Sequence, residues 1–273
     1  MDLDLIKQKL NNFEQKKGNY QKSDRVNHFW KPSVGKQVIR IVPNKFNNSN
    51  PFTELRFYYG IGDKNVMISP TNFGGDDPIY EFVKELYKTN SRDNWALAKQ
   101  LKAKNRYFAP VLVRGEEDQG VKLWQFGTLV YKELLSIAMD EEIGDYTDVY
   151  EGRDITVETV GPEVTGTRYN KSSVRVKIKQ TPISEDKAKV EKYLEEQVNP
   201  AEIFKKYTFD EMKAALQSHL TPEDTPQEGD IIDDEKPTET NYTLNSGPKK
   251  SKSDEFDELF SAEGSEKEDD LPF

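Results

Sequence analysis

Between residues 36 and 180 the chain is a succession of short runs rich in β-branched and aromatic residues, separated by Gly, Pro, Asn and Asp. Such runs predict strands, and many short strands with inserted helices favour a small β-barrel over a parallel sheet. We therefore expect a mainly β core with inserted helices, of the α+β class. The predicted strands are 37–43, 54–61, 65–70, 107–115, 121–127, 154–160 and 173–180.

Apolar residues at three- and four-residue steps predict helices at 78–88, 94–104 and 128–139. The region 184–220 is also predicted to be helical, with possible N-caps at Ser184 and Thr208. Thr208 followed by Glu211 fits a capping box. An amphipathic helix is expected over 1–17, and it docks either on its own domain or on a neighbouring copy.

Negative charge is concentrated at one end of the chain. Residues 221–273 carry 17 acidic and 5 basic side chains, whereas the other 220 residues carry 32 and 34. The end is rich in Pro, Glu, Asp, Ser, Thr and Gly, a composition typical of disorder. This asymmetry predicts an N-terminal arm over 1–29, a folded core over 30–220 and a disordered acidic tail over 221–273.

The residue inventory excludes several classes of function. The chain has no cysteine and only His28 and His219, which argues against a structural zinc site, a thiol nucleophile and a Ser-His-Asp triad. Adjacent carboxylates, such as Asp76 with Asp77, are interpreted as solvated loop residues. No stretch fits a transmembrane helix or a signal peptide. We expect no cofactor, no metal, no catalytic residue and no membrane association.

Two stretches, 95–115 and 164–184, contain no acidic residue. In the predicted strand 173–180, Val174, Val176 and Ile178 alternate with cations, so one face is apolar and the other basic. Cations that follow phosphates and rings that stack on bases suit single-stranded nucleic acid, without a preference for particular bases. The predicted DNA-binding residues are Arg40, Tyr58, Tyr59, Lys99, Lys102, Lys104, Arg106, Tyr107, Trp124, Tyr131, Arg168, Tyr169, Lys171, Arg175, Lys177 and Lys179.

The residues alone leave other interpretations open. A basic strand face is often only the solvated side of a sheet, and some of these rings belong to a core. A stacking cleft does not by itself exclude RNA, so an RNA-binding OB protein is one alternative. An interaction adaptor whose barrel binds protein is another.

Several segments, taken in order, resemble the single-stranded-DNA-binding, helix-destabilising proteins of T-even-type phages. They are KQVIRIVPNK with NPFTELRFYYGI, LKAKNRYFAPVLV, KLWQFGTLVYKEL, SVRVKIKQ and YTFDEMKAAL. Together they extend over roughly residues 30–217. Each segment is weak alone, but their order and spacing make the resemblance fairly specific.

The resemblance implies an OB-fold barrel core with a small helical subdomain and a basic, aromatic cleft for single-stranded DNA. By matched position, Lys102, Lys104 and Tyr107 fall in a basic and aromatic strand, and Arg175, Lys177 and Lys179 in the last strand. It also implies that the protein coats and protects DNA in phage replication, recombination and repair, in the cytoplasm of the infected host cell.

The chain departs from the family pattern at a zinc subdomain. Asp77-Pro78-Ile79-Tyr80 stands where the best-known members have a Cys-Pro-x-Cys turn. We expect apolar packing by Ile79, Phe82, Val83 and Leu86 to replace the metal there.

The resemblance further implies self-association along DNA through the arm and recruitment of partners by the tail. The nearest analogues of the family's basic arm cluster are Lys16, Lys17 and Lys22. The ending EKEDDLPF is similar to the acidic, Phe-ended tail of bacterial single-strand-binding proteins, which partner enzymes bind at the terminal Pro-Phe. The predicted binding residues for replication and recombination proteins are Asp269, Asp270, Leu271, Pro272 and Phe273. A solubilising tail is the alternative.

Overall fold

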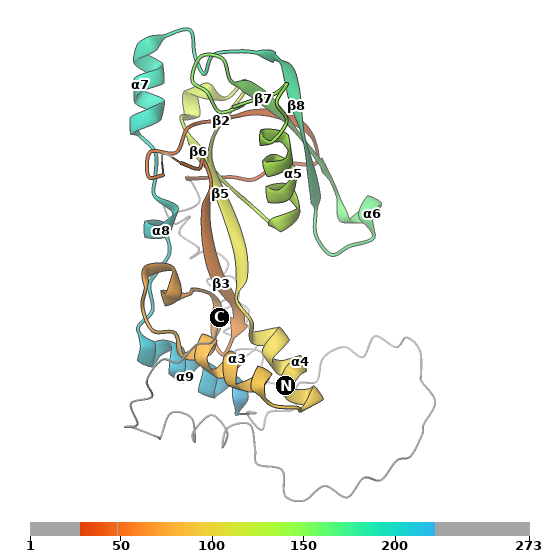
Figure 1. Cartoon of the computed structure of the whole chain (residues 1–273), viewed down its shortest axis with the longest axis vertical. Helices are drawn as coiled ribbons and strands as arrows, with labels where there is room; N and C mark the ends of the chain where they lie inside the picture. Colours follow the sequence, from red (N-terminus) through yellow and green to blue (C-terminus); the bar gives the residue numbers. More distant parts are fainter. Residues whose placement is uncertain (1–27, 48, 222–273) are drawn as a thin grey trace, which may run out of the picture. The chain divides into compact units, whose positions relative to one another are not determined.

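The structure is a computed structural model that describes residues 28–47 and 49–221 (Figure 1). The helix predicted over 1–17 and the predicted acidic tail lie outside these residues. The chain divides into two compact units. Unit 1 contains the described residues up to Arg56 together with Asn105–Lys205, and unit 2 contains Phe57–Lys104 and the described residues from Lys206 onward.

Strands form where the runs of β-branched and aromatic residues predict them, with boundaries shifted by a few residues. They are β1 (Phe29–Trp30), β2 (Gly35–Ile41), β3 (Thr53–Ile61), β4 (Lys64–Ile68), β5 (Lys104–Val113), β6 (Lys122–Phe126), β7 (Arg153–Val160) and β8 (Lys171–Gln180). Only β1 was not predicted, because two residues are too few to show an alternation.

Helices form where they are predicted in the described ranges, and one more, over Pro162–Thr165, is not predicted. They are α3 (Pro78–Lys88), α4 (Arg92–Leu101), α5 (Thr128–Ala138), α6 (Pro162–Thr165), α7 (Lys187–Glu195), α8 (Pro200–Ile203) and α9 (Phe209–Leu220), with short 3-10 turns η1 (Pro70–Phe73) and η2 (Glu117–Gln119). No helix in the described ranges is long and apolar enough to cross a membrane.

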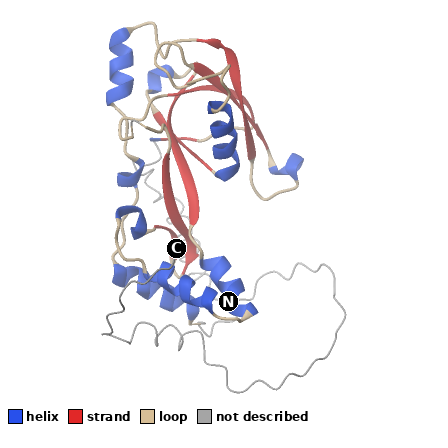
Figure 2. Cartoon of the chain, viewed as in Figure 1, coloured by secondary structure: helices blue, strands red, loops and turns tan. Residues whose placement is uncertain are grey.

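The strands of unit 1 form one curved sheet. Its order in the described residues is β1-β6-β5-β2-β7-β8, and β3 joins it by pairing with β5. β1 runs parallel to β6, whereas the β6–β5, β5–β2, β2–β7 and β7–β8 pairs are antiparallel. The sheet strands, red in Figure 2, lie around the helix α5. The predicted α+β class, mainly β with inserted helices, is confirmed.

Alternation along the strands of unit 1 sends apolar side chains to both faces of the sheet. On one face, Ile39 and Ile155 are fully buried with Leu134 of α5. On the other, Leu112 packs with Val190 of α7. Because the sheet is covered on both faces, the sequences of its central strands are nearly continuous apolar runs and do not alternate between apolar and polar residues.

Unit 2 is a small helical subdomain around a separate core. One face of α3 buries Ile79, Phe82, Val83 and Leu86, as the sequence predicts. Their neighbours in this core include Leu101 of α4 and Met212, Ala215 and Leu216 of α9. The apolar packing predicted in place of a metal is therefore present, and in the described ranges no three His, Cys, Asp or Glu side chains gather as metal ligands would.

Asp77 begins α3. Its Oδ1 accepts hydrogen bonds from the backbone N–H groups of Ile79 and Tyr80, both at 3.1 Å. Its Oδ2 accepts from the Tyr58 hydroxyl at 2.9 Å and from the Ser69 hydroxyl. A carboxylate at a helix N-terminus satisfies otherwise unpaired backbone donors. Asp77 therefore fixes the start of the helix at the position where the resemblance places a metal-binding turn.

The two predicted caps differ in outcome. At α9 the Thr208 hydroxyl accepts from the N–H of Glu211, whose carboxylate accepts from the N–H of Thr208, so the capping box is confirmed. At α7 the predicted cap Ser184 is wrong. The cap is Asp186, whose carboxylate accepts a hydrogen bond from the N–H of Ala188. Ser184 lies two residues before Asp186, and its hydroxyl accepts from the N–H of Asp186.

Candidate nucleic-acid interface

The last strand of the sheet, β8, carries the predicted basic row. Its neighbour β7 pairs with it from Val160 opposite Lys171 to Ile155 opposite Val176. Val174 and Val176 pack against the core of unit 1, while Arg175 and Lys177 are exposed. The predicted division of this strand into an apolar and a basic face is confirmed for these residues.

The division ends at an irregularity near the end of β8. The register shifts between the Arg153–Gln180 and Ile155–Val176 pairs, so β8 has extra residues there. Extra residues locally redirect side chains. Ile178, predicted to share the apolar face with Val174 and Val176, is instead 91% exposed. Lys177 and Lys179 flank it and are exposed as well.

The connection between β7 and β8 adds further exposed cations and a ring. It contains α6 and a turn in which Gly166 has a φ of +64° and the Thr167 hydroxyl donates to the carbonyl of Tyr169 at 2.8 Å. Tyr169 is 74% exposed, and Arg168 and Lys171 are exposed beside it in the sequence. The connection between β7 and β8 (Figure 1) therefore carries an exposed aromatic ring with exposed cations on either side in the sequence.

Hollows adjoin the hairpin of β7 and β8 at several places along β8. One, of about 410 Å³, is lined by Arg175 and Lys36 but also by Glu133 and Glu158. Glu158 lies 3.7 Å from Lys36, and Glu133 accepts from the N–H of Val174 at 3.1 Å. Because two carboxylates share this hollow, its local charge is mixed.

A second hollow, of about 420 Å³, lies between the start of β8 and the start of α5. Lys171 lines it together with Leu129 and Phe126. Leu129 is 68% exposed, so an apolar side chain is available at the edge of this hollow. An apolar wall beside a cation suits a nucleotide, whose base is flat and whose phosphate is charged.

The rings of Tyr107 and Tyr131 pack against each other within the protein. Their rings are stacked, with centroids 3.8 Å apart and planes at 14°. Tyr107 is buried and Tyr131 is partly buried, and Phe52 meets Tyr131 edge-on at 5.4 Å. Of this predicted pair, Tyr131 is the ring with more surface open to solvent.

Besides Tyr107, the predicted DNA-binding residues Arg40, Tyr58 and Trp124 are buried in the interior. Arg40 is fully buried and Trp124 is 1% exposed, both in unit 1, while Tyr58 is 2% exposed in unit 2. Trp124 packs on Trp30, and the Tyr58 hydroxyl donates to Asp77. The burial of these three residues gives no support for a direct contact with DNA, because alternation in a sheet covered on both faces does not distinguish the exposed side.

Arg40 belongs to a buried ionic network in unit 1. Its Nε lies 3.7 Å from Asp154, and its Nη2 donates to the carbonyl and the hydroxyl of Thr181. Arg114 donates to the same Asp154 oxygen at 3.0 and 2.9 Å and to the carbonyl of Ile183 at 2.8 Å. Burial lowers the pKa of Arg40 to about 10 in spite of the attraction of Asp154. The network ties the segment that follows β8 to the sheet.

The remaining predicted cations are divided between the units. Lys99, Lys102 and Lys104 are exposed in unit 2, where Tyr59 is half-buried. Arg106 is half-buried in unit 1, with its guanidinium close to Gly127. Two sets of exposed cations are thus present, one in each unit. The predicted arm residues Lys16, Lys17 and Lys22 and the predicted tail residues 269–273 lie outside the described residues.

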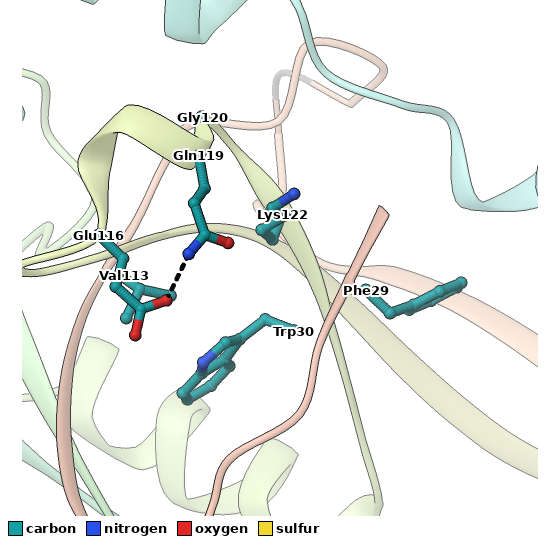
Figure 3. Close-up of a pocket in the computed structure, with 7 residues that line it drawn as sticks. All are labelled: Phe29, Trp30, Val113, Glu116, Gln119, Gly120 and Lys122. Atoms are coloured by element: carbon teal, nitrogen blue, oxygen red, sulfur yellow. Dashed lines mark hydrogen bonds between the residues drawn. The ribbon is translucent and has the colours of Figure 1, made fainter. Parts of the chain in front are cut away.

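A further small hollow, of about 170 Å³, contains none of the predicted DNA-binding residues (Figure 3). Phe29 and Trp30 line it together with Lys122. The side-chain amide of Gln119 donates a hydrogen bond to the Glu116 carboxylate at 3.0 Å, so each of these polar groups has a hydrogen-bond partner. Because Glu116 and Lys122 both line this hollow, its local charge is mixed.

Lys36 and Leu129 line the hollows beside the hairpin but were not predicted as site residues. Leu129 fits the apolar pattern of its helix, and Lys36, which lies in β2, directly precedes the predicted strand 37–43. Neither residue has a sequence pattern that distinguishes a binding residue from a structural residue.

No curated protein matches this chain. The family described as gp32 DNA binding protein like matches residues 33–220, which is more than half of the 273 residues and includes both sets of exposed cations. The chain therefore belongs to the gp32 DNA-binding-protein-like family.

Proposed function

We propose that this protein coats single-stranded DNA without sequence preference and has no enzymatic activity of its own. The observation that carries the proposal is the exposed basic row of β8, continued by Arg168, Tyr169 and Lys171 at the hairpin, in a chain of a DNA-binding family. Cations on a strand edge contact phosphates, which every sequence has, and exposed rings stack on any base.

The proposal includes a biological setting. The protein protects single-stranded DNA during phage replication, recombination and repair in the cytoplasm of the infected cell. It associates with further copies along the strand through its arm, and it recruits replication and recombination proteins through its acidic tail. The family match supports DNA binding, and the charge pattern of the sequence supports the roles of arm and tail.

The first test is a titration of the full chain with a fluorescent oligo(dT), followed by anisotropy at several salt concentrations. We expect the logarithm of the binding constant to fall linearly with the logarithm of salt, with a slope of about −0.7 per phosphate neutralised. Competition with a matched oligo(U) separates DNA from RNA specificity. A slope near zero, or no binding at low salt with or without the tail, contradicts the proposal and favours a protein-binding adaptor.

The second test removes the tail. Deleting residues 221–273 takes away 17 acidic and 5 basic side chains, so we expect tighter DNA binding and loss of partner capture. The matched control deletes only Leu271, Pro272 and Phe273, which keeps the acidic charge. This control is expected to bind DNA as the full chain does but to lose partner proteins in a pull-down. Equal DNA affinity of the full and shortened chains rejects competition by the tail.

A further inference from the structure

Unit 2 has an exposed row of one aromatic and three basic side chains along α4. Arg92, Trp95, Lys99 and Lys102 follow one another at steps of three and four residues, so they lie on one side of the helix. All four are exposed. At 1.5 Å per residue the row is about 15 Å long. The acidic residue of this helix, Asp93, falls on a different side, because it is two residues from Trp95.

Trp95 is 54% exposed, whereas Trp30 and Trp124 are 8% and 1% exposed. A tryptophan is one of the largest apolar side chains, and exposure of half its surface is typical of a contact site. Its indole meets the ring of Tyr87 edge-on, with centroids 5.8 Å apart and planes at 75°. This contact from α3 restricts the orientation of the indole while leaving much of it open to solvent.

Two other lysines of the same unit pair with acidic side chains, unlike the cations of the row. Lys88 lies 2.6 Å from Glu85, and Lys64 lies 2.5 Å from Asp63. Within the described residues, Arg92, Lys99 and Lys102 have no such ion pair with an acidic side chain. Their positive charge is therefore not neutralised by a described neighbour, and it surrounds the exposed indole.

We propose that this row is a base-stacking site for single-stranded DNA in unit 2. Trp95 stacks on a base, and Arg92, Lys99 and Lys102 contact the phosphates on either side of it. The combination of an open ring with unpaired cations at helical spacing fits a flexible polyanion with flat bases. The inference rests on the proposed function and adds to it a site with a named stacking residue.

Trp95→Phe tests the site through fluorescence. With Trp30 and Trp124 buried, we expect most of the quenching of tryptophan emission by oligo(dT) to come from Trp95. The variant keeps an aromatic ring, so it should still bind DNA by anisotropy but lose that quenching. Wild-type quenching in this variant overturns the proposal.

Trp95→Ala tests the contribution to affinity. Loss of one stacked base is expected to weaken oligo(dT) binding about 5- to 150-fold, with an unchanged circular dichroism spectrum. The matched control is Tyr80→Ala, because Tyr80 is 51% exposed on α3 of the same unit but follows Asp76 and Asp77 and precedes Glu81. The control is expected to bind within about twofold of the wild type, by analogy with other surface substitutions.

The outcomes separate the two proposals. If wild type and Trp95→Ala bind with equal affinity, the protein binds DNA but not through this row. If Tyr80→Ala weakens binding as much as Trp95→Ala, the effect is not specific to the row and the inference is wrong. If the wild type binds no oligo(dT) in any form, both the proposed function and this site are rejected.

Discussion

Replacing Arg175, Lys177 and Lys179 together by alanine is expected to weaken oligo(dT) binding by about two orders of magnitude. The three side chains are exposed on β8 and are expected to contact phosphates. At about 1 kcal/mol for each contact, their loss amounts to about 3 kcal/mol, or roughly a hundredfold in the dissociation constant. The slope of binding against salt should become shallower by about 2, because three phosphates are no longer neutralised.

The matched control changes the net charge equally at another place in unit 1. Lys187, Lys189 and Lys192 are exposed on α7, and alanine is a favourable helix residue. This triple variant should keep the binding constant within a few-fold and nearly the same salt slope. An equal loss in both triple variants means that total charge, and not the β8 row, determines binding. An unchanged constant in the β8 variant removes this strand from the interface.

Replacing Asp154 by asparagine is expected to destabilise unit 1 by about 3–5 kcal/mol. The change leaves the fully buried Arg40 without its ionic partner, and removal of one member of a buried ion pair is costly for this reason. In the described structure Nε and Nη1 of Arg40 have no hydrogen-bond partner, so the charge depends on Asp154 for compensation. Urea unfolding measures the loss. In a Trp95→Phe background, emission from Trp30 and Trp124 reports unit 1 alone.

Two further variants distinguish a buried charge from a general effect of the substitution. Glu158→Gln on the same strand breaks the exposed pair with Lys36 and is expected to cost at most about 1 kcal/mol. Adding Arg40→Met to Asp154→Asn removes the unpaired buried charge, so part of the lost stability should return. The explanation fails if the single Asp154 variant loses less than about 1 kcal/mol or if the double variant is less stable still.

The strands and helices could be predicted because their signals are local. The apolar side of 78–88 has helical spacing, and the buried side of α3 has the same residues. The capping box at Thr208 is a pattern of two residues three positions apart, and it forms as predicted. The β1 strand and the cap of α7 depend on pairing and on competition between neighbouring acceptors, which a short segment does not show.

The candidate site was less predictable, because exposure depends on the whole fold. Arg40 and Arg175 occupy similar alternating strands, but Arg40 is buried on β2, between β5 and β7, whereas Arg175 is on the last strand of the sheet. Tyr58 and Tyr169 are both tyrosines near predicted strands, so the sequence does not distinguish them, but Tyr58 is in the core of unit 2. Trp95 is not among the predicted site residues, because an aromatic residue in a predicted amphipathic helix fits the core equally well. Its spacing to Lys99 and Lys102 is nevertheless visible in the sequence.

Unit 2 is assembled from two pieces of chain that are far apart in sequence, and this has a consequence for synthesis. The ribosome releases the chain from its N-terminus, so Ile79, Phe82 and Leu86 emerge well before Met212 and Leu216, their partners from α9. Until α9 has left the ribosomal tunnel, the apolar side of α3 lacks part of its cover. During that interval the nascent chain exposes a surface of the kind that chaperones bind.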